Sequence, residues 1–218
     1  MAKTSKAWMR EHVTDPYVKR ANAEGYRSRA AYKLQQIDAR DKLLKAGMTV
    51  VDLGAAPGGW SQVAAEGVGP TGRVIALDIL EMRQVPGVTV ICGDFNDAAT
   101  LRALEQALDG STVDLVLSDM APNISGIASA DQARAMGLAE LAINFASKHL
   151  KPQGNFLVKT FQGAGYEGLV QSLRRSFLKV YTRKPDASRS RRRRGRRARG
   201  RCRGRWRGRH GPCPTGSR

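Results

Sequence analysis

The stretch "VVDLGAAPGGW" (Val50–Trp60) decides the fold of this chain. It begins as an apolar run that includes Asp52, and it continues into a loop with three glycines, Gly54, Gly58 and Gly59. A short apolar run of this kind is typical of a strand, and the glycines allow a tight turn and a close backbone approach before a helix begins. The stretch therefore predicts a strand, a turn and a helix in succession.

Similar apolar runs recur along the chain, and helix-length segments separate them. They cover residues 48–54, 72–79, 88–95, 113–120 and 154–161, with a sixth at 177–185. Residues 99–108 and 135–154 are expected to be crossover helices, the second ending at Pro152 and Gly154, and residues 7–46 predict a basic segment of two helices. Strands that alternate with helices indicate an α/β fold, a mostly parallel sheet with helices on both faces.

In such a sheet, ligands bind beyond the carboxyl ends of the strands. The polar residues that close the runs are Asp52, Asp78, Asp94, Asp119 and Lys159. Asp78 is placed to accept hydrogen bonds from both hydroxyls of a ribose, and Asp94 from an adenine amino group. The loop lacks the G-x-G-x-x-G pattern that would hold a pyrophosphate, which disfavours a nicotinamide dehydrogenase. These features together point to an adenosine ligand without phosphates, and S-adenosylmethionine is the candidate.

Asp94, Trp60 and Lys159 also have structural interpretations. A strand-end aspartate such as Asp94 can cap the next helix. Trp60 can pack in the core instead of lining the pocket, and a strand-end lysine such as Lys159 ordinarily extends to solvent. The residue types alone leave these alternatives open.

The segments "SRAAYKLQQID", "DLGAAPGGWSQ", "GDF", "SDMAPNISG" and "FLVKTFQG" occur in this order between residues 28 and 163. The arrangement closely resembles the FtsJ/RrmJ (RlmE) family of ribosomal RNA large subunit ribose 2′-O-methyltransferases, from about residue 5 to about residue 191. The resemblance implies a Rossmann-like methyltransferase fold and S-adenosylmethionine as methyl donor. It implies as substrate a uridine in the A-loop of 23S ribosomal RNA, within the large ribosomal subunit.

The resemblance also assigns site residues. The chemistry is expected to need no metal, and His12, His149 and His210 show no ligand spacing. The family's cofactor residues fall on Gly58, Trp60, Asp78, Asp94 and Asp119, and three of its catalytic residues fall on Lys33, Asp119 and Lys159. Lys159 could lose its proton and act as the base, or it could steer the lone pair of the ribose hydroxyl, and Asp119 favours the charged lysine. Arg27 and Arg29 are expected to contact RNA phosphates.

The end of the chain departs from the family. Residues 188–218 hold fourteen arginines and no acid, so subtracting them from the formal net charge of +18 leaves +4 for residues 1–187. We expect a methyltransferase domain at 1–187 and a disordered tail at 188–218 that binds RNA phosphates. Arg194 stands where the family's fourth catalytic residue, a Glu, should be. The Arg and Gly that follow predict that the family's last antiparallel strand is missing.

Our hypothesis is that this ending is read out of frame, and the alternative is an evolved RNA-binding arm. Three cysteines without a paired framework indicate a reducing compartment, and the chain shows no apolar leader or membrane span. We expect a cytoplasmic monomer. Because Arg194 replaces the Glu, the alternative to a working methyltransferase is an RNA-binding ribosome-assembly protein that has lost turnover.

Overall fold

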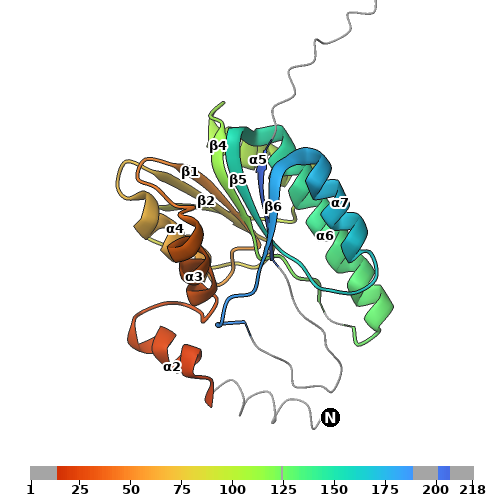
Figure 1. Ribbon diagram of the computed structural model, residues 1–218. Coiled ribbons are helices and arrows are strands. Elements are labelled where there is room, and N and C mark those ends of the chain that lie inside the picture. Colours follow the sequence, from red (N-terminus) through yellow and green to blue (C-terminus); the bar gives the residue numbers. More distant parts are fainter. Residues whose placement is uncertain (1–13, 124, 189–200, 207–218) are drawn as a thin grey trace, which may run out of the picture.

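The computed structural model describes residues 14–123, 125–188 and 201–206, the last of these as backbone. Within these residues the centre is a seven-stranded sheet with the order β3-β2-β1-β4-β5-β7-β6 (Figure 1). The strands are β1 (Thr49–Leu53), β2 (Arg73–Asp78), β3 (Val88–Cys92), β4 (Val113–Ser118), β5 (Leu150–Lys159), β6 (Phe177–Arg183) and β7 (Arg201–Trp206). The helices are α2 (Pro16–Ala23), α3 (Ala31–Asp41), α4 (Gly59–Val68), α5 (Ala98–Leu108), α6 (Ala128–His149) and α7 (Tyr166–Ser176).

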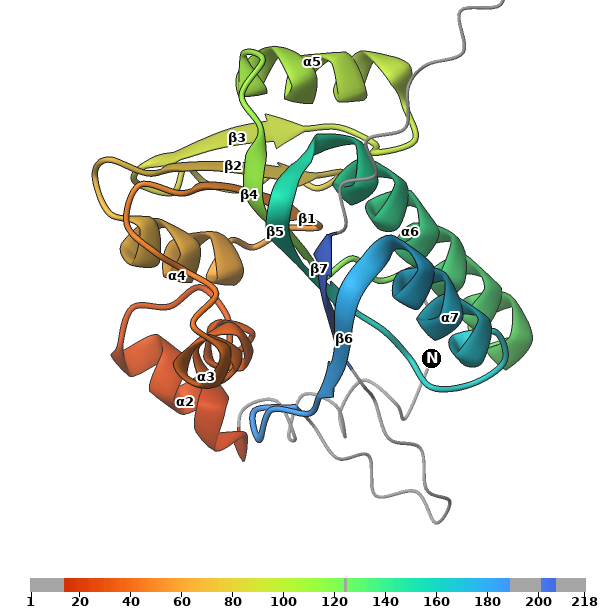
Figure 2. The same ribbon diagram turned by 45° about the horizontal axis from the view of Figure 1, so that its top comes forward.

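Strand β1 lies inside the sheet, next to its central strand, and shows why both faces are covered. It pairs in parallel with β2 on one side and with β4 on the other. Successive side chains of a strand point to opposite faces, so Val50 packs with α3 and α4 whereas Val51 and Leu53 pack with α5, α6 and α7. Figure 2 shows the two helical layers on either side of the sheet. The predicted fold class is confirmed.

The start of β5 differs from the sequence-based expectation. Helix α6 ends at His149, and Pro152 and Gly154 lie inside β5 instead of ending the helix. The pairing of β4 with β5 is irregular here, because Val113 pairs with Leu150 while Leu115 already pairs with Asn155. Residues 151–154 therefore bulge away from the regular ladder, and a proline is tolerated at such a bulge because no ladder donor is needed from it.

The predicted absence of the last strand is wrong. Residues Arg201–Trp206 form β7, which pairs antiparallel with β5 on one side and with β6 on the other. A ladder is made by backbone N–H and C=O groups, which Arg, Cys, Gly and Trp supply as well as any residue except proline. Without β7, the neighbouring edges of β5 and β6 would have unpaired backbone groups. The hydrogen bonds that β7 makes to both edges thus outweigh the low strand preference of its side chains. The expected boundary at residue 187 consequently does not end the domain.

The insertion of β7 between two strands makes a prediction about Gly204, which pairs with Phe156 and with Val180. Gly204→Pro removes the backbone donor in the middle of the strand, and it should lower the free energy of unfolding by about 3 kcal/mol or more. Gly204→Ala keeps the donor and serves as the matched control. Denaturant unfolding of both variants is the measurement, and equal stabilities would show that this strand pairing contributes nothing.

Candidate functional site at the carboxyl edge of the sheet

The predicted site residues gather at one edge of the sheet, where the parallel strands end. Asp78 ends β2 and Lys159 ends β5, while Asp119 directly follows β4 and Asp94 comes two residues after β3. Backbone hydrogen bonds hold these strand ends together. The N–H of Gly54 donates to Leu77 at 2.8 Å, and the N–H of Asp119 donates to Leu53 at 3.1 Å. The strand-end residues Asp78, Asp94, Asp119 and Lys159 therefore lie at the same edge of the sheet, as the topology predicts.

The glycines of the loop after β1 are required by close contacts. Gly54 has φ +74°, and a Cβ at this position would lie 2.6 Å from the side chain of Met120, beyond β4. Gly58 has φ +106°, and a Cβ there would meet Val85 at 3.0 Å and Arg27 at 3.2 Å. Only glycine adopts such backbone angles freely, so the loop can lie against its neighbours only with glycine at both positions.

Trp60 lies in the core rather than exposed beside the loop. Its side chain is 2% exposed and belongs to the apolar cluster between the sheet and helices α3 and α4. The indole N–H donates to the carbonyl of Ala30 at 2.8 Å. The core interpretation thus describes the ring, and a contact of Trp60 with a ligand stays a prediction.

Asp78 is held by the loops around it. One carboxylate oxygen accepts from the N–H of Ala56 and the other from the N–H of Leu80, each at 2.8 Å. Each carboxylate oxygen has a second lone pair, so an oriented Asp78 can still accept hydrogen bonds from two hydroxyls. This geometry is compatible with the predicted ribose contact.

Asp94 is not a helix cap. The N-cap of α5 is Asp97, whose side chain accepts from the N–H of Ala99 at 3.2 Å. Asp94 instead accepts from the backbone and side-chain N–H groups of Asn96 through one oxygen, Oδ1. Hydrogen bonds from Asn96 hold the pKa of the Asp94 carboxyl below its ordinary value. An exposed, ionised acceptor next to Asp78's strand is compatible with recognition of an amino group.

Asp119 and Lys159 form the charged pair of the site. The Lys159 ammonium lies 3.0 Å from Asp119 Oδ1 and also donates to the Asp119 backbone carbonyl. The two side chains are 16% and 19% exposed, so the pair is shielded but reachable from solvent. Lys159 therefore does not extend freely into solvent. Lys33, the third predicted catalytic residue, lies partly buried in the first turn of α3.

The arginines expected to contact RNA have structural partners. Arg27 donates to the backbone carbonyls of Arg83 and Gln84 beside the glycine loop, and Arg29 forms an ion pair with Asp15. Arg29 also donates to the carbonyl of Ala187. These contacts connect the N-terminal helices to the domain. Contact of either arginine with phosphate stays a prediction.

Asp52 is a feature of the site that the sequence reasoning named without assigning a role. Its side chain is fully buried under the glycine loop, Oδ2 accepts from the Ser61 hydroxyl at 2.7 Å, and Oδ1 has no partner. Burial raises the pKa of the Asp52 carboxyl to about 7, and the charges of Asp119 and Asp78 act in the same direction against the Ser61 hydrogen bond. The signal in the sequence was a carboxylate inside an otherwise apolar run.

This buried acid predicts a pH dependence of stability. The unfolded chain ionises Asp52 near the ordinary pKa of 3.8, while the folded chain keeps it protonated up to about 7. Between these values the folded state binds more protons, so stability falls as the pH rises, by about 3 kcal/mol between pH 5 and pH 8. Asp52→Asn imitates the protonated acid and should remove this difference.

Denaturant unfolding of the parent and of Asp52→Asn at both pH values measures the effect. Glu140→Gln is the control, because it removes an exposed acid on α6 and keeps Asp52. Identical pH profiles for the parent and Asp52→Asn would mean that Asp52 is ionised in the folded protein throughout.

Comparison with known proteins gives consistent matches. The model of the FtsJ-like methyltransferase family matches residues 26–194. A protein of Azoarcus sp. (strain BH72) named ribosomal RNA large subunit methyltransferase E is 62% identical over 189 residues, which cover 87% of this chain and 92% of that protein. A protein of Methylobacillus flagellatus with the same name is 61% identical over 188 residues, or 86% of this chain and 91% of that protein.

Solved structures show the same fold. A candidate ribosomal RNA methyltransferase of Plasmodium falciparum superposes with a TM-score of 0.71 at 28% identity, covering 84% of this chain and all of that one. Aeropyrum pernix fibrillarin, solved with bound S-adenosyl-L-methionine, has a TM-score of 0.54 at 16% identity, over 82% of this chain and 75% of that one. The second likeness concerns the fold alone.

Proposed function

The chain belongs to the FtsJ-like methyltransferase family, and on that premise we propose that it methylates the ribose 2′-hydroxyl of a uridine in the A-loop of 23S ribosomal RNA. The methyl donor would be S-adenosylmethionine, and the substrate would be the large ribosomal subunit in the cytoplasm. The observation that carries the proposal is the shielded Asp119–Lys159 pair at the edge where Asp78 is held by two loops. The relatives named for ribosomal RNA supply the substrate class.

The residues present fit an adenosine cofactor without phosphates. Asp78 would accept from the ribose hydroxyls, Asp94 from the adenine amino group, and Asp119 would face the end that bears the sulfonium. Gly58 and the backbone of Trp60 would allow close approach, since the loop has no Cβ at its tightest point. Nothing in the loop resembles a pyrophosphate cradle, which supports this ligand over a dinucleotide.

The chemistry assigned to the chain is positioning and proton handling. When bound, S-adenosylmethionine would supply a methyl group already activated by a positive sulfur. The chain must align the ribose oxygen with that carbon and accept one proton as the oxygen forms its new bond. Ion pairing with Asp119 favours the charged form of Lys159, which supports a role in steering the lone pair of the hydroxyl by a hydrogen bond. The Asp119 carboxylate can then accept the proton, and Lys33, if α3 brings it to the same edge, would add positive charge near the reacting oxygen.

An alternative function rests on Arg194, which occupies the position of the family's Glu and lies outside the described residues. In this alternative the chain binds ribosomal RNA and supports subunit assembly without turnover. The tail arginines would bind RNA phosphates in either case. A parent chain that binds S-adenosylmethionine and RNA but transfers no methyl group would favour the alternative.

The cofactor assignment predicts the effect of Asp78→Ala. Loss of one or two hydrogen bonds to the ribose should weaken binding of S-adenosylmethionine by about 1–3 kcal/mol. Glu81→Ala is the matched control, because it removes an exposed acid three residues away. Isothermal titration calorimetry measures both affinities. Unchanged affinity in Asp78→Ala, or tight binding of NAD in place of S-adenosylmethionine, would contradict the assignment.

The catalytic assignment predicts the effect of Lys159→Ala. Methyl transfer to undermethylated large subunits should fall at least about 100-fold, while affinity for S-adenosylmethionine should change little, because the lysine acts at the hydroxyl. Lys148→Ala removes an exposed lysine from the end of α6 and should keep the parent rate. Incorporation of a radiolabelled methyl group is the readout, and a parent-like rate in Lys159→Ala would exclude this lysine from the mechanism.

A further inference from the structure

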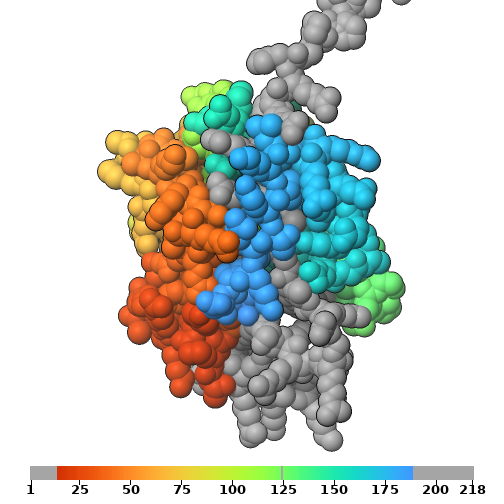
Figure 3. All heavy atoms as spheres, viewed as in Figure 1, coloured from red at the N-terminus to blue at the C-terminus, as the bar shows by residue number. Residues whose placement is uncertain are grey.

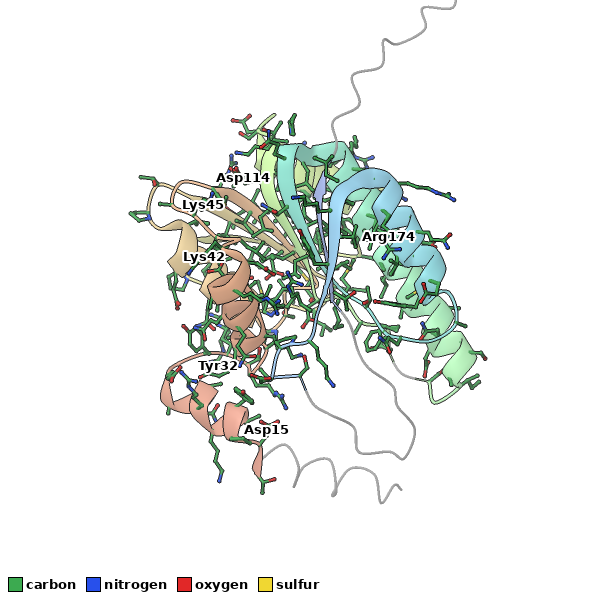
Figure 4. The ribbon with its side chains drawn as sticks, in the orientation of Figure 1. Asp15, Tyr32, Lys42, Lys45, Asp114 and Arg174 are labelled. Carbon is green, nitrogen blue, oxygen red and sulfur yellow. The ribbon has the colours of Figure 1, made fainter. Side chains whose placement is uncertain are left out.

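The chain after β6 crosses back to the N-terminal helices instead of leaving the domain. Figure 3 shows this blue segment lying against the orange and red N-terminal part of the chain. We call residues 183–187 the clasp, since Arg183 and Ala187 contact residues within the range 21–41 through side chains and backbone together. Figure 4 places Asp15 at the start of α2 and Tyr32 on α3, on the side of the molecule where the clasp arrives.

The first contact of the clasp is a two-pronged ion pair. Arg183 donates from Nε to Asp41 Oδ2 at 2.9 Å and from Nη2 to Asp41 Oδ1 at 3.0 Å. The side chains are 16% and 7% exposed. A fork of this kind fixes orientation as well as distance, because both groups are planar. The end of β6 is thereby fixed to the last residue of α3.

The second contact is at Ala187, which is fully buried. Its N–H donates to Gln36 Oε1 at 3.1 Å, and its carbonyl accepts from Arg29. Its side chain packs in a small apolar cluster with Ala21 and Tyr32. The backbone of Ala187 is thus hydrogen-bonded both by Gln36 of α3 and by Arg29, which lies two residues before α3.

These contacts bracket Lys33. Tyr32 precedes it, Gln36 lies one helical turn later, and Asp41 ends the same helix. Helix α3 packs on α4, which in turn packs on β1 and β2, whereas Lys159 ends β5 on the other side of the central strand β4. The clasp connects these two parts of the molecule through the sheet. Lys159 pairs with Arg201 of β7, and Arg201 pairs with Arg183 of β6, so the three residues lie in one row across the sheet.

We propose that the clasp positions helix α3, and with it Lys33, relative to Lys159. The ion pair Asp41–Arg183 is the central contact, and neither residue touches the reacting atoms. The positioning of α3 is independent of any activity, while its effect on turnover rests on the proposed function. Breaking the pair should loosen α3 and misplace Lys33 without changing the cofactor edge formed by β1, β2 and β4.

Three variants separate positioning from simple destabilisation. Arg183→Gln and Asp41→Asn each leave one charge without its partner, whereas Asp41→Asn/Arg183→Gln removes both charges. The double variant should therefore recover stability relative to the singles while the fork stays lost. Lys148→Gln, which breaks the exposed Lys148–Glu105 pair, is the control.

The primary measurement is backbone hydrogen exchange, followed peptide by peptide. Exchange over residues 31–41 should quicken at least tenfold in all three variants and less than twofold over β4, with no change in the control. Exchange over residues 31–41 at the parent rate in the double variant would overturn the proposal, as would an equal increase over β4.

Methyl transfer is the second measurement. With saturating RNA and cofactor, kcat should fall at least tenfold in the double variant, with the Kd for S-adenosylmethionine within twofold of the parent. A parent-like kcat would refute the positioning of Lys33. If the parent itself methylates no ribosomal RNA, the proposed function fails, and the exchange of residues 31–41 alone decides whether the clasp holds α3.

Discussion

The structure depends on the close approach of the loop after β1 to the loop after β4. Gly54 has no Cβ, which leaves room for Met120 of the second loop. Its N–H also donates to the carbonyl of Leu77 near the end of β2. This approach brings the ends of three strands together, so that Asp78 and Asp119 belong to one site. A side chain at Gly54 would lie too close to Met120, so the two loops would have to move apart.

Strand β1, which leads into this loop, also buries the carboxyl of Asp52, and burial of a carboxyl is unfavourable. The strand that carries the glycine loop also buries a carboxylate with one satisfied and one unsatisfied oxygen, near two further acids. A protonated Asp52 avoids placing a third negative charge beneath the site. Asp119 forms the ion pair with Lys159, whereas Asp52 is the fully buried carboxyl, with its pKa raised to about 7.

In the far half of the sheet, backbone pairing and charged contacts add to the apolar packing that includes Phe156 and Phe177. Strand β7 joins β5 to β6 through backbone pairing, and the clasp joins β6 to α3 through Arg183 and Ala187. Together they connect the N-terminal helices that carry Lys33 to the strand that carries Lys159. The contacts Arg183–Asp41 and Ala187–Gln36 each join residues more than 140 positions apart in the sequence.

The sequence by itself determined the alternation of strands and helices, the glycine loop, and the carboxylates and lysine that close the strands, because burial periodicity and turn chemistry are local properties. It misjudged residues 201–206, since strand preference describes side chains whereas a ladder between two open edges is made by the backbone. It could not place Trp60 in the core, find the partners of Arg27 and Arg29, or reveal the clasp. Those features arise where distant segments meet, and only the tertiary structure brings Asp41 to Arg183 and Ala187 to Gln36.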